Sequence, residues 1–286
     1  MFVKILSSWA LNLAHVGKVS FYEGMWFDSH VHFDRFVAQE RLVPLLEKAA
    51  MANVNGMLSV GGSPEANALS RRLASDHEGL IFASAGYDRD LADELYDGMT
   101  LEMQVADPLV RAVGETGLDY FHQQDNKKSQ QALFGLNLEL AVRYDKPVIV
   151  HSRAADEDTL AILADYADQR CEHPGVLHCF TLDQACARRL LDLGFMISFS
   201  GIVTFANADA LREVVTYIPD DRLLVETDAP YLAPIPERGK ENEPAFVRHT
   251  GAKLAALRDT SVEALAEMSM QNAWNLFRIG KKELVR

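Results

Sequence analysis

The amino-acid sequence predicts an α/β protein that folds as a single (β/α)8 TIM barrel. Short runs rich in Val, Ile and Leu alternate with stretches of helical periodicity, and the connections between them are short. Uninterrupted apolar runs are typical of parallel strands that are buried on both faces. Eight such strands alternating with helices indicate a closed barrel, which usually takes about 250 residues.

The predicted strands are short apolar runs, and several of them end at a polar residue. They are Trp26–His30, Val54–Val60, Leu80–Ala85, Val110–Gly114, Val148–Val150, Gly175–His178, Phe195–Phe199 and Arg222–Val225. The second run stops at Gly61-Gly62, and Lys146-Pro147 precedes the fifth. An open doubly wound sheet is the alternative, but no glycine-rich nucleotide motif follows the first strand.

The predicted helices carry apolar residues three or four positions apart, which places them on one face. They are Arg41–Met51, Pro64–Ser75, Leu91–Val105, Lys128–Arg143, Asp156–Ala167, Gln184–Leu193, Leu211–Tyr217, Ala245–Leu257 and Val262–Phe277. The segment from Pro234 to Pro244 is rich in Pro, Gly and charge. It predicts a long loop at the mouth of the barrel.

One domain, residues 25–286, is predicted to carry the barrel. Met25 stands just before the first strand, so we expect residues 1–24 to be an N-terminal extension outside the core fold. The stretch from Ile5 to Ala14 weakly resembles a signal peptide, which is the less favoured interpretation. No apolar run approaches the ~20 residues that span a bilayer.

Charge and cysteine content narrow the function classes. The 286 residues carry a net charge of −13, which argues against passive coating of DNA because the phosphates would be repelled. A nucleic-acid substrate is still compatible with this charge if a metal supplies positive charge locally. Cys171, Cys179 and Cys186 lack metal-type spacing and are expected to be free thiols in a cytoplasmic protein.

Histidine and carboxylate side chains recur at the carboxyl ends of five predicted strands. They are His30, His32, Glu115, His151, His178 and Asp228. His30 and His32 are two residues apart, so an extended strand directs both to the same side. The carboxyl ends of barrel strands meet at one mouth, and these side chains are the ligands of catalytic divalent metals. The sequence therefore predicts a metal site there.

Six ligands exceed what one catalytic zinc usually takes. A two-metal centre bridged by a carboxylate, with ions ~3.5–4 Å apart, is the natural arrangement, and Glu115 is the preferred catalytic bridge. Taken singly, each histidine would more often be structural, but their coincidence at one end of five strands favours the site. The remaining histidines are expected to be surface residues: His15, His77, His122, His173 and His249.

Seven blocks of sequence carry a family resemblance. They are Asp28–Asp34, Gly114–Tyr120, Pro147–Arg153, Leu177–Phe180, Ile197–Gly201, Glu226–Leu232 and Arg238–Pro244. In these blocks the chain resembles the TatD-type metal-dependent deoxyribonucleases, a branch of the amidohydrolase-like barrels. The resemblance implies two divalent cations. His30, His32, Glu115 and Asp228 would hold one cation, and Glu115, His151 and His178 the other.

The resemblance also implies roles for single residues in a magnesium-dependent hydrolase of DNA ends. Asp228 is expected to be the general base on the attacking water. Arg153 would contact a phosphate by a forked pair of hydrogen bonds, or else form a surface ion pair. Arg238 and Lys240 would guide an anionic substrate, or else form a solvated charge run. Glu226 would orient a ligand histidine.

Two departures from the family pattern bear on the substrate. Gly86-Tyr87-Asp88-Arg89 stands where the family usually carries Gly-x-His-Pro, so Asp88 replaces a histidine on the substrate side. A carboxylate there would repel a phosphate unless metal or Arg89 offsets its charge. Thr181-Leu182 replaces the usual small residue and glycine. All six predicted ligands are retained.

The sequence thus predicts water-mediated phosphodiester hydrolysis, with DNA or another phosphodiester as a transient partner. No membrane and no obligate protein partner are expected. The cations would be Mg²⁺, Mn²⁺ or Zn²⁺, because imidazoles favour zinc while carboxylates and water admit the others. A hydrolase of esters, lactones or amides is the first alternative, slightly favoured by Asp88. An inactive scaffold is the second, and the complete ligand set argues against it.

Overall fold

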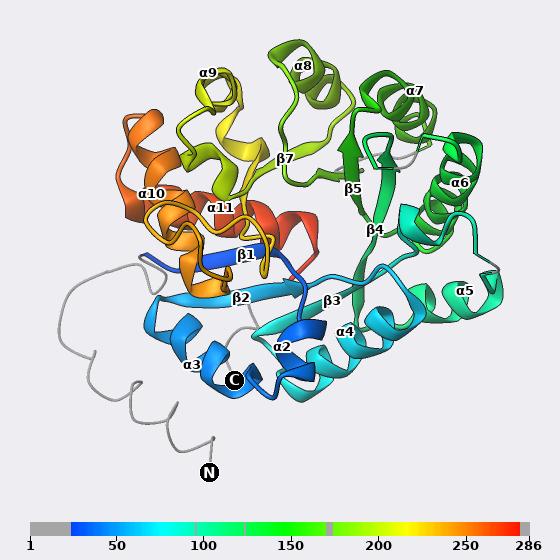
Figure 1. Ribbon diagram of the computed structural model, residues 1–286, viewed down its shortest axis with the longest axis horizontal. Coiled ribbons are helices and arrows are strands. Elements are labelled where there is room, and N and C mark those ends of the chain that lie inside the picture. The colour runs from blue at the N-terminus through cyan, green and yellow to red at the C-terminus, as the bar shows by residue number, and fades with distance from the viewer. Residues whose placement is uncertain (1–23, 95, 123, 170–173, 281–286) are drawn as a thin grey trace.

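A computed structural model describes residues 24–94, 96–122, 124–169 and 174–280 of the chain. Eight parallel strands pair in chain order in one sheet, which confirms the predicted barrel (Figure 1). The strands are β1 (Trp26–Val31), β2 (Val54–Ser59), β3 (Ile81–Ala85), β4 (Val110–Asp119), β5 (Val148–Arg153), β6 (Gly175–Leu177), β7 (Met196–Phe199) and β8 (Leu223–Val225).

Helices follow the strands along the chain, and most of them lie around the outside of the sheet (Figure 1). They are α2 (Asp34–Ala38), α3 (Leu42–Met51), α4 (Pro64–Asp76), α5 (Gly98–Ala106), α6 (Lys127–Arg143), α7 (Asp156–Ala167), α8 (Gln184–Asp192), α9 (Asp209–Tyr217), α10 (Val247–Leu257) and α11 (Val262–Leu276). Short 3₁₀ turns add η1 (Arg89–Leu91), η2 (Gly201–Thr204), η3 (Asp220–Arg222) and η4 (Pro244–Phe246).

The barrel closes where β1 meets the residues that follow β8. Val31 pairs with Ala229 in a parallel bridge. The His32 N–H donates to the Ala229 carbonyl at 2.8 Å, and the Asp228 N–H donates to the His30 carbonyl at 3.0 Å. This seam therefore brings the first histidine pair beside Asp228, although the two segments lie at opposite ends of the domain's sequence.

One apolar side chain from each strand fills a layer of the barrel interior. These side chains are Phe27, Leu58, Phe82, Ala112, Ile149, Val176, Met196 and Leu224. Side chains of α11 pack against the same layer, and the Phe277 ring that follows α11 lies 6.0 Å from the ring of Phe27. Because this part of the interior is filled by packing, the polar chemistry is left to the carboxyl ends of the strands.

The largest differences from the predicted elements lie near the third helix. A helix was predicted over Leu91–Val105, but the structure has the single turn η1 and then α5, which begins at Gly98. Asp97 precedes α5, and its side chain accepts a hydrogen bond from the Met99 N–H at 2.9 Å. Such an N-cap fixes where a helix begins. The short helix α2 was not predicted.

Strand β4 continues to Asp119, although it was predicted to end at Gly114. Gly117 has a φ of +140°, which side-chain-bearing residues rarely adopt. A Cβ there would lie 2.0 Å from the carbonyl oxygen of His151 on β5. The glycine therefore allows the two strands that carry Glu115 and His151 to pair closely.

The predicted extension over residues 1–24 stays a prediction, because residues 1–23 lie outside the described part of the chain. The predictions for His15, Cys171 and His173 also fall outside the described residues. Cys179 and Cys186 are free thiols. Within the described ranges, no helix is long and apolar enough to cross a bilayer.

Candidate metal centre

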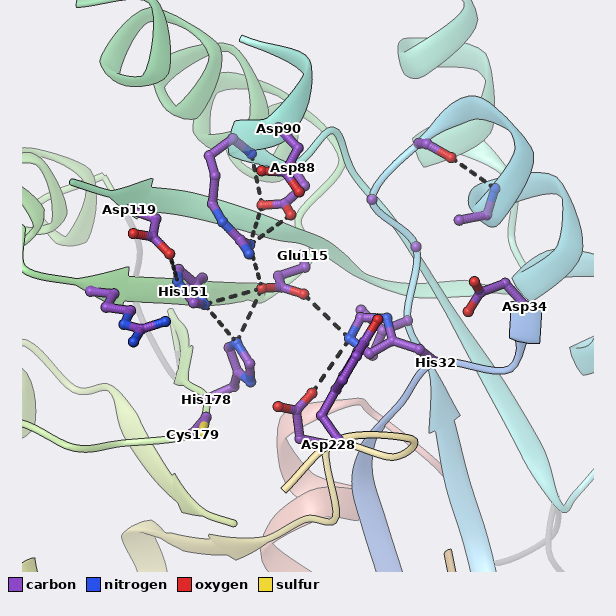
Figure 2. A pocket seen from close by; sticks show the side chains of 18 of the residues that line it. His32, Asp34, Asp88, Asp90, Glu115, Asp119, His151, His178, Cys179 and Asp228 are labelled. Atoms are coloured by element: carbon purple, nitrogen blue, oxygen red, sulfur yellow. Dashed lines mark hydrogen bonds and ion pairs between the residues drawn. The ribbon is translucent and has the colours of Figure 1, made fainter. Parts of the chain in front are cut away.

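The six predicted ligand side chains converge at the carboxyl mouth of the barrel. Figure 2 shows His32, Glu115, His151, His178 and Asp228. They surround a cavity of about 810 Å³, and all of them except the fully buried His30 line its wall. This volume is in the range of small-molecule sites. The structure thus brings together residues that five different strand ends contribute.

His30, His32 and Asp228 form a first cluster across the β1–β8 seam. The Nε2 atoms of the two histidines lie 3.1 Å apart. Asp228 Oδ1 lies 3.8 Å from Nε2 of His30 and 3.5 Å from Nε2 of His32. Asp228 has a φ of +58°, in the left-handed region that Asp tolerates better than most residues. Three donor atoms therefore meet at one point.

Glu115, His151 and His178 form a second cluster on neighbouring strands. Glu115 Oε1 lies 3.3 Å from Nδ1 of His151 and 3.2 Å from Nε2 of His178. The two histidine nitrogens are 3.3 Å apart. Pairing of Gly117 with His151 holds β4 beside β5, and the His178 N–H donates to the Val150 carbonyl of β5.

Glu115 joins the two clusters, because its two oxygens face different sides. Its other oxygen, Oε2, lies 3.5 Å from Nε2 of His30 and 3.6 Å from Nε2 of His32. Figure 2 shows Glu115 with His151 and His178 on one side and His32 and Asp228 on the other. A carboxylate placed in this way could be shared by both clusters of ligand atoms.

Two further carboxylates hold the outward nitrogens of the second cluster's histidines. Asp119 Oδ2 lies 3.4 Å from Nε2 of His151. Glu226 Oε1 lies 3.3 Å from Nδ1 of His178 and accepts the Cys179 N–H at 2.7 Å. A carboxylate on the far nitrogen fixes the orientation of a histidine and turns its free lone pair toward a metal. Glu226 thus lies where the sequence placed it.

The carboxylates at the centre are ionised at neutral pH. Burial favours the neutral form of Glu115, but the charges of His178 and Arg89 outweigh it and hold its pKa well below the ordinary range. Burial likewise opposes ionisation of Asp228, but its hydrogen bond with His32 and the neighbouring histidine charges lower its pKa. Two anionic carboxylates are therefore available to divalent cations.

The residues present fit a pair of divalent cations. The donor atoms within each cluster lie within 4.8 Å of one another, as they must to share an ion. Imidazole nitrogens and carboxylate oxygens are the ligands that zinc, manganese and magnesium sites use in different proportions. The donor chemistry alone is compatible with each of these ions.

Arg153 is the one predicted substrate contact that lines the cavity among the described residues. Its guanidinium lies 4.0 Å from the centre of the Phe121 ring. Its Nη1 is 2.8 Å from Nε2 of His122, which also lines the cavity. An aromatic stack and one polar contact thus fix the plane of the guanidinium.

Arg238 and Lys240 are not brought to the cavity. The guanidinium of Arg238 stacks on Phe205, 3.8 Å from the ring centre. The Lys240 ammonium donates to Glu237 at 2.5 Å, and its side chain is 68% exposed. Neither residue lines the cavity, so their predicted contact with substrate has no support in the geometry.

The two departures from the family pattern both reach the cavity wall. Asp88 and Thr181 line it. Arg89 Nη1 donates to both oxygens of Asp88, at 2.7 and 2.6 Å. Burial and the charge of Glu115 raise the pKa of Asp88 to about 6, with Arg89 acting in the opposite direction. Arg89 therefore offsets the charge of Asp88, as the sequence suggested.

Sequence reasoning missed the role of Asp119 and part of the role of His122. Asp119 lies four positions after Glu115, so strand alternation would have placed both on one face if β4 had been predicted at full length. His122 is exposed as expected, but it also faces the cavity. His77 and His249, which were also expected at the surface, are partly exposed and partly buried.

Comparisons with known proteins agree with this site. A family model described as "TatD related DNase" matches residues 27–278. The chain is similar to the uncharacterized metal-dependent hydrolase YcfH of Escherichia coli K12, with 43% identity over 90% of this chain and 97% of YcfH. It is 33% identical to the 3'-5' ssDNA/RNA exonuclease TatD of Musicola paradisiaca, over 83% of this chain and 92% of that protein.

A solved structure agrees as well. The crystal structure of YJJV, a TatD homologue from Escherichia coli K12, superposes with a TM-score of 0.80 at 30% identity, covering 89% of this chain and 98% of YJJV. The barrel, the two clusters at its mouth and the match over nearly the whole domain lead to one conclusion. The chain belongs to the TatD-related DNase family of metal-dependent hydrolases.

Proposed function

We propose that this protein hydrolyses phosphodiester bonds of DNA at a centre of two divalent cations. The observation that carries the proposal is the placement of Glu115, whose two oxygens face two separate clusters of ligand atoms. When bound, such a pair of cations activates water and stabilises the attacking and leaving oxygens. The family description and the relative named as an exonuclease support DNA as the substrate.

Asp228 is the general base in this proposal. Its carboxylate lines the cavity, its side chain is 13% exposed, and its pKa is lowered, so it is ionised and reachable by water. A base must lie within hydrogen-bond reach of the proton it accepts. Glu115 is more buried and is engaged on both oxygens, so it holds the geometry of the centre instead.

Arg153 contacts the substrate phosphate in this proposal. Its guanidinium lines the cavity and is held flat on Phe121, which suits two parallel hydrogen bonds to a phosphate. The charge of Asp88, which had slightly favoured a carbonyl substrate, is offset by Arg89. This pairing removes an obstacle to a phosphodiester substrate and so supports the proposal.

DNA would be a transient partner, and no obligate protein partner belongs to the proposal. We place the activity in the cytoplasm, because Cys179 and Cys186 are free thiols. The cations are Mg²⁺, Mn²⁺ or Zn²⁺, and the experiment below compares them.

The test is a substrate panel. The full chain is stripped with EDTA and reloaded with Mg²⁺, Mn²⁺ or Zn²⁺. It is then incubated with end-labelled single- and double-stranded DNA, and in parallel with carboxyl esters, lactones and amides. We expect shortened DNA with at least one ion, and a loss of about 100-fold or more for Asp228→Asn, as for removal of a general base.

Arg71→Gln is the control variant, because Arg71 pairs with Asp107 away from the cavity and should not change the rate. Intact DNA together with hydrolysis of a carboxyl ester would overturn the proposal.

A further inference from the structure

A partly buried arginine lies against one side of the candidate centre and not the other. Arg89 Nη1 donates to Glu115 Oε1 at 2.9 Å as well as to Asp88, and its side chain is only 18% exposed. A guanidinium carries a permanent positive charge and has no acceptor. Within the described residues, its Nε atom is buried and has no hydrogen-bond partner.

The hydrogen bond from Arg89 to Glu115 falls on the side of the second cluster. Oε1 of Glu115 is the oxygen that faces His151 and His178, whereas Oε2 faces His30 and His32. A cation in the second cluster would therefore share its carboxylate oxygen with a charge-assisted hydrogen bond. It would also lie within a few ångströms of a fixed positive charge, at a distance where repulsion between like charges is strong.

Asp88 reduces this repulsion without removing it. Its carboxylate holds Arg89 in place through two hydrogen bonds, and the Arg89 N–H donates to the same carboxylate at 2.7 Å. The guanidinium nevertheless bridges the two carboxylates, since its Nη1 lies 2.6 Å from Asp88 Oδ2 and 2.9 Å from Glu115 Oε1. The pair thus presents its positive end to the second cluster.

We propose that Arg89 makes the two clusters differ in cation affinity. Its guanidinium supplies part of the positive charge of the second cluster and thereby weakens the binding of a cation there. The cluster of His30, His32 and Asp228 then binds its cation tightly, and the cluster of Glu115, His151 and His178 binds its cation at least about 10-fold more weakly, as expected when a charge-assisted hydrogen bond competes for a ligand oxygen. This inference rests on the proposed two-cation centre.

The contact can be removed by changing both residues of the pair. Neither a histidine at position 88 nor a proline at position 89 would place a guanidinium against Glu115. The double variant Asp88→His/Arg89→Pro should therefore bring the two affinities together. Proline is tolerated at the first position of a helical turn, which is where Arg89 lies in η1.

The test is cation binding and not activity. The full chain, stripped with EDTA, is titrated with Mn²⁺ by calorimetry, and electron paramagnetic resonance reports when two ions become coupled. The wild type should bind two ions at affinities at least about 10-fold apart. Arg89→Gln should raise the affinity for the second ion by about 10-fold, the scale of one lost charge-assisted contact. The affinity for the first ion should stay within about twofold of the wild type.

Two further variants separate this effect from loss of folding. Asp88→Asn removes the carboxylate charge that offsets Arg89, so it should lower the affinity for the second ion further. This change is opposite in sign to that of Arg89→Gln. Arg153→Gln is the matched control, since it removes an arginine from the same cavity that contacts Phe121 and His122 instead of Glu115. It should leave both affinities unchanged.

Equal affinities for the two ions in the wild type would overturn the inference, and so would an unchanged second affinity in Arg89→Gln. Neither result would affect the proposed function. Failure of Mn²⁺, Mg²⁺ and Zn²⁺ to bind at all would overturn the two-cation centre itself.

Discussion

Asp119 shows how a residue outside the ligand clusters can control the centre. Burial favours its neutral form, but hydrogen bonds from His151 and from the backbone N–H groups of His122 and Phe121 outweigh it and hold its pKa well below the ordinary range. The carboxylate therefore stays ionised at neutral pH and keeps its hold on Nε2 of His151. This leaves Nδ1 of His151 directed at Glu115.

The variant Asp119→Asn should weaken the cation of the second cluster by about 10–100-fold, the usual cost of losing a carboxylate behind a ligand histidine. Calorimetric titration with Mn²⁺ measures this directly. Asp125→Asn is the matched control, because Asp125 is exposed and does not line the cavity. Unchanged affinity in Asp119→Asn would show that His151 is held by its packing alone.

At the scale of the element, each cluster depends on contacts between strands. The first cluster exists because β1 meets the residues after β8, and the second because β4, β5 and β6 lie side by side. The sequence predicted these strands from their apolar runs. It could not show that β4 continues past Gly114, because two glycines interrupt the apolar pattern there and Gly117 takes a backbone conformation open mainly to glycine.

The helix α11 contributes at the opposite end of the strands. Phe277, just after α11, is 1% exposed and packs against the barrel layer that includes Phe27. Phe277→Ala should lower the free energy of unfolding by about 3–5 kcal/mol, as large-to-small changes in a core do. Urea unfolding measures this loss.

The same variant should leave the cation affinities of the folded protein unchanged, because the polar clusters lie at the carboxyl mouth. Val262→Ala, at the exposed start of α11, is the control and should change stability little. A loss below about 1 kcal/mol in Phe277→Ala would mean that the interior relaxes to fill the space.

At the scale of the whole molecule, the barrel and the gathering of six side chains could be predicted because both follow from strand order. In a parallel barrel, the end of every strand reaches the same mouth. The contacts of Arg89 with Glu115 and of Arg238 with Phe205 could only be seen in the structure, since they depend on which way long side chains turn. For that reason the substrate contacts were the least predictable part of the site.

The overall charge of −13 sets how such a protein can bind an anionic polymer. Arg89 and Arg153 are the arginines that line the cavity among the described residues, and no lysine lines it there. Arg89 is already engaged by Glu115 and Asp88. If the protein acts on DNA as proposed, attraction of the phosphates would therefore come mainly from bound cations and from Arg153.

Binding of DNA should accordingly require divalent cations and depend only weakly on salt. With a nuclease-resistant phosphorothioate oligonucleotide, fluorescence anisotropy should show affinity in Mg²⁺ and a loss of about 100-fold or more in EDTA, as when a few phosphate contacts are removed. The slope of log affinity against log salt should stay shallower than about −3, because each contact on a single strand contributes about −0.7.

Arg153→Gln should make this salt slope shallower still. Arg238→Gln and Lys240→Gln, which lie outside the cavity, are the controls and should leave the slope unchanged. Cation-independent binding with a steep slope that the last two variants reduce would instead place the DNA on the mouth loop.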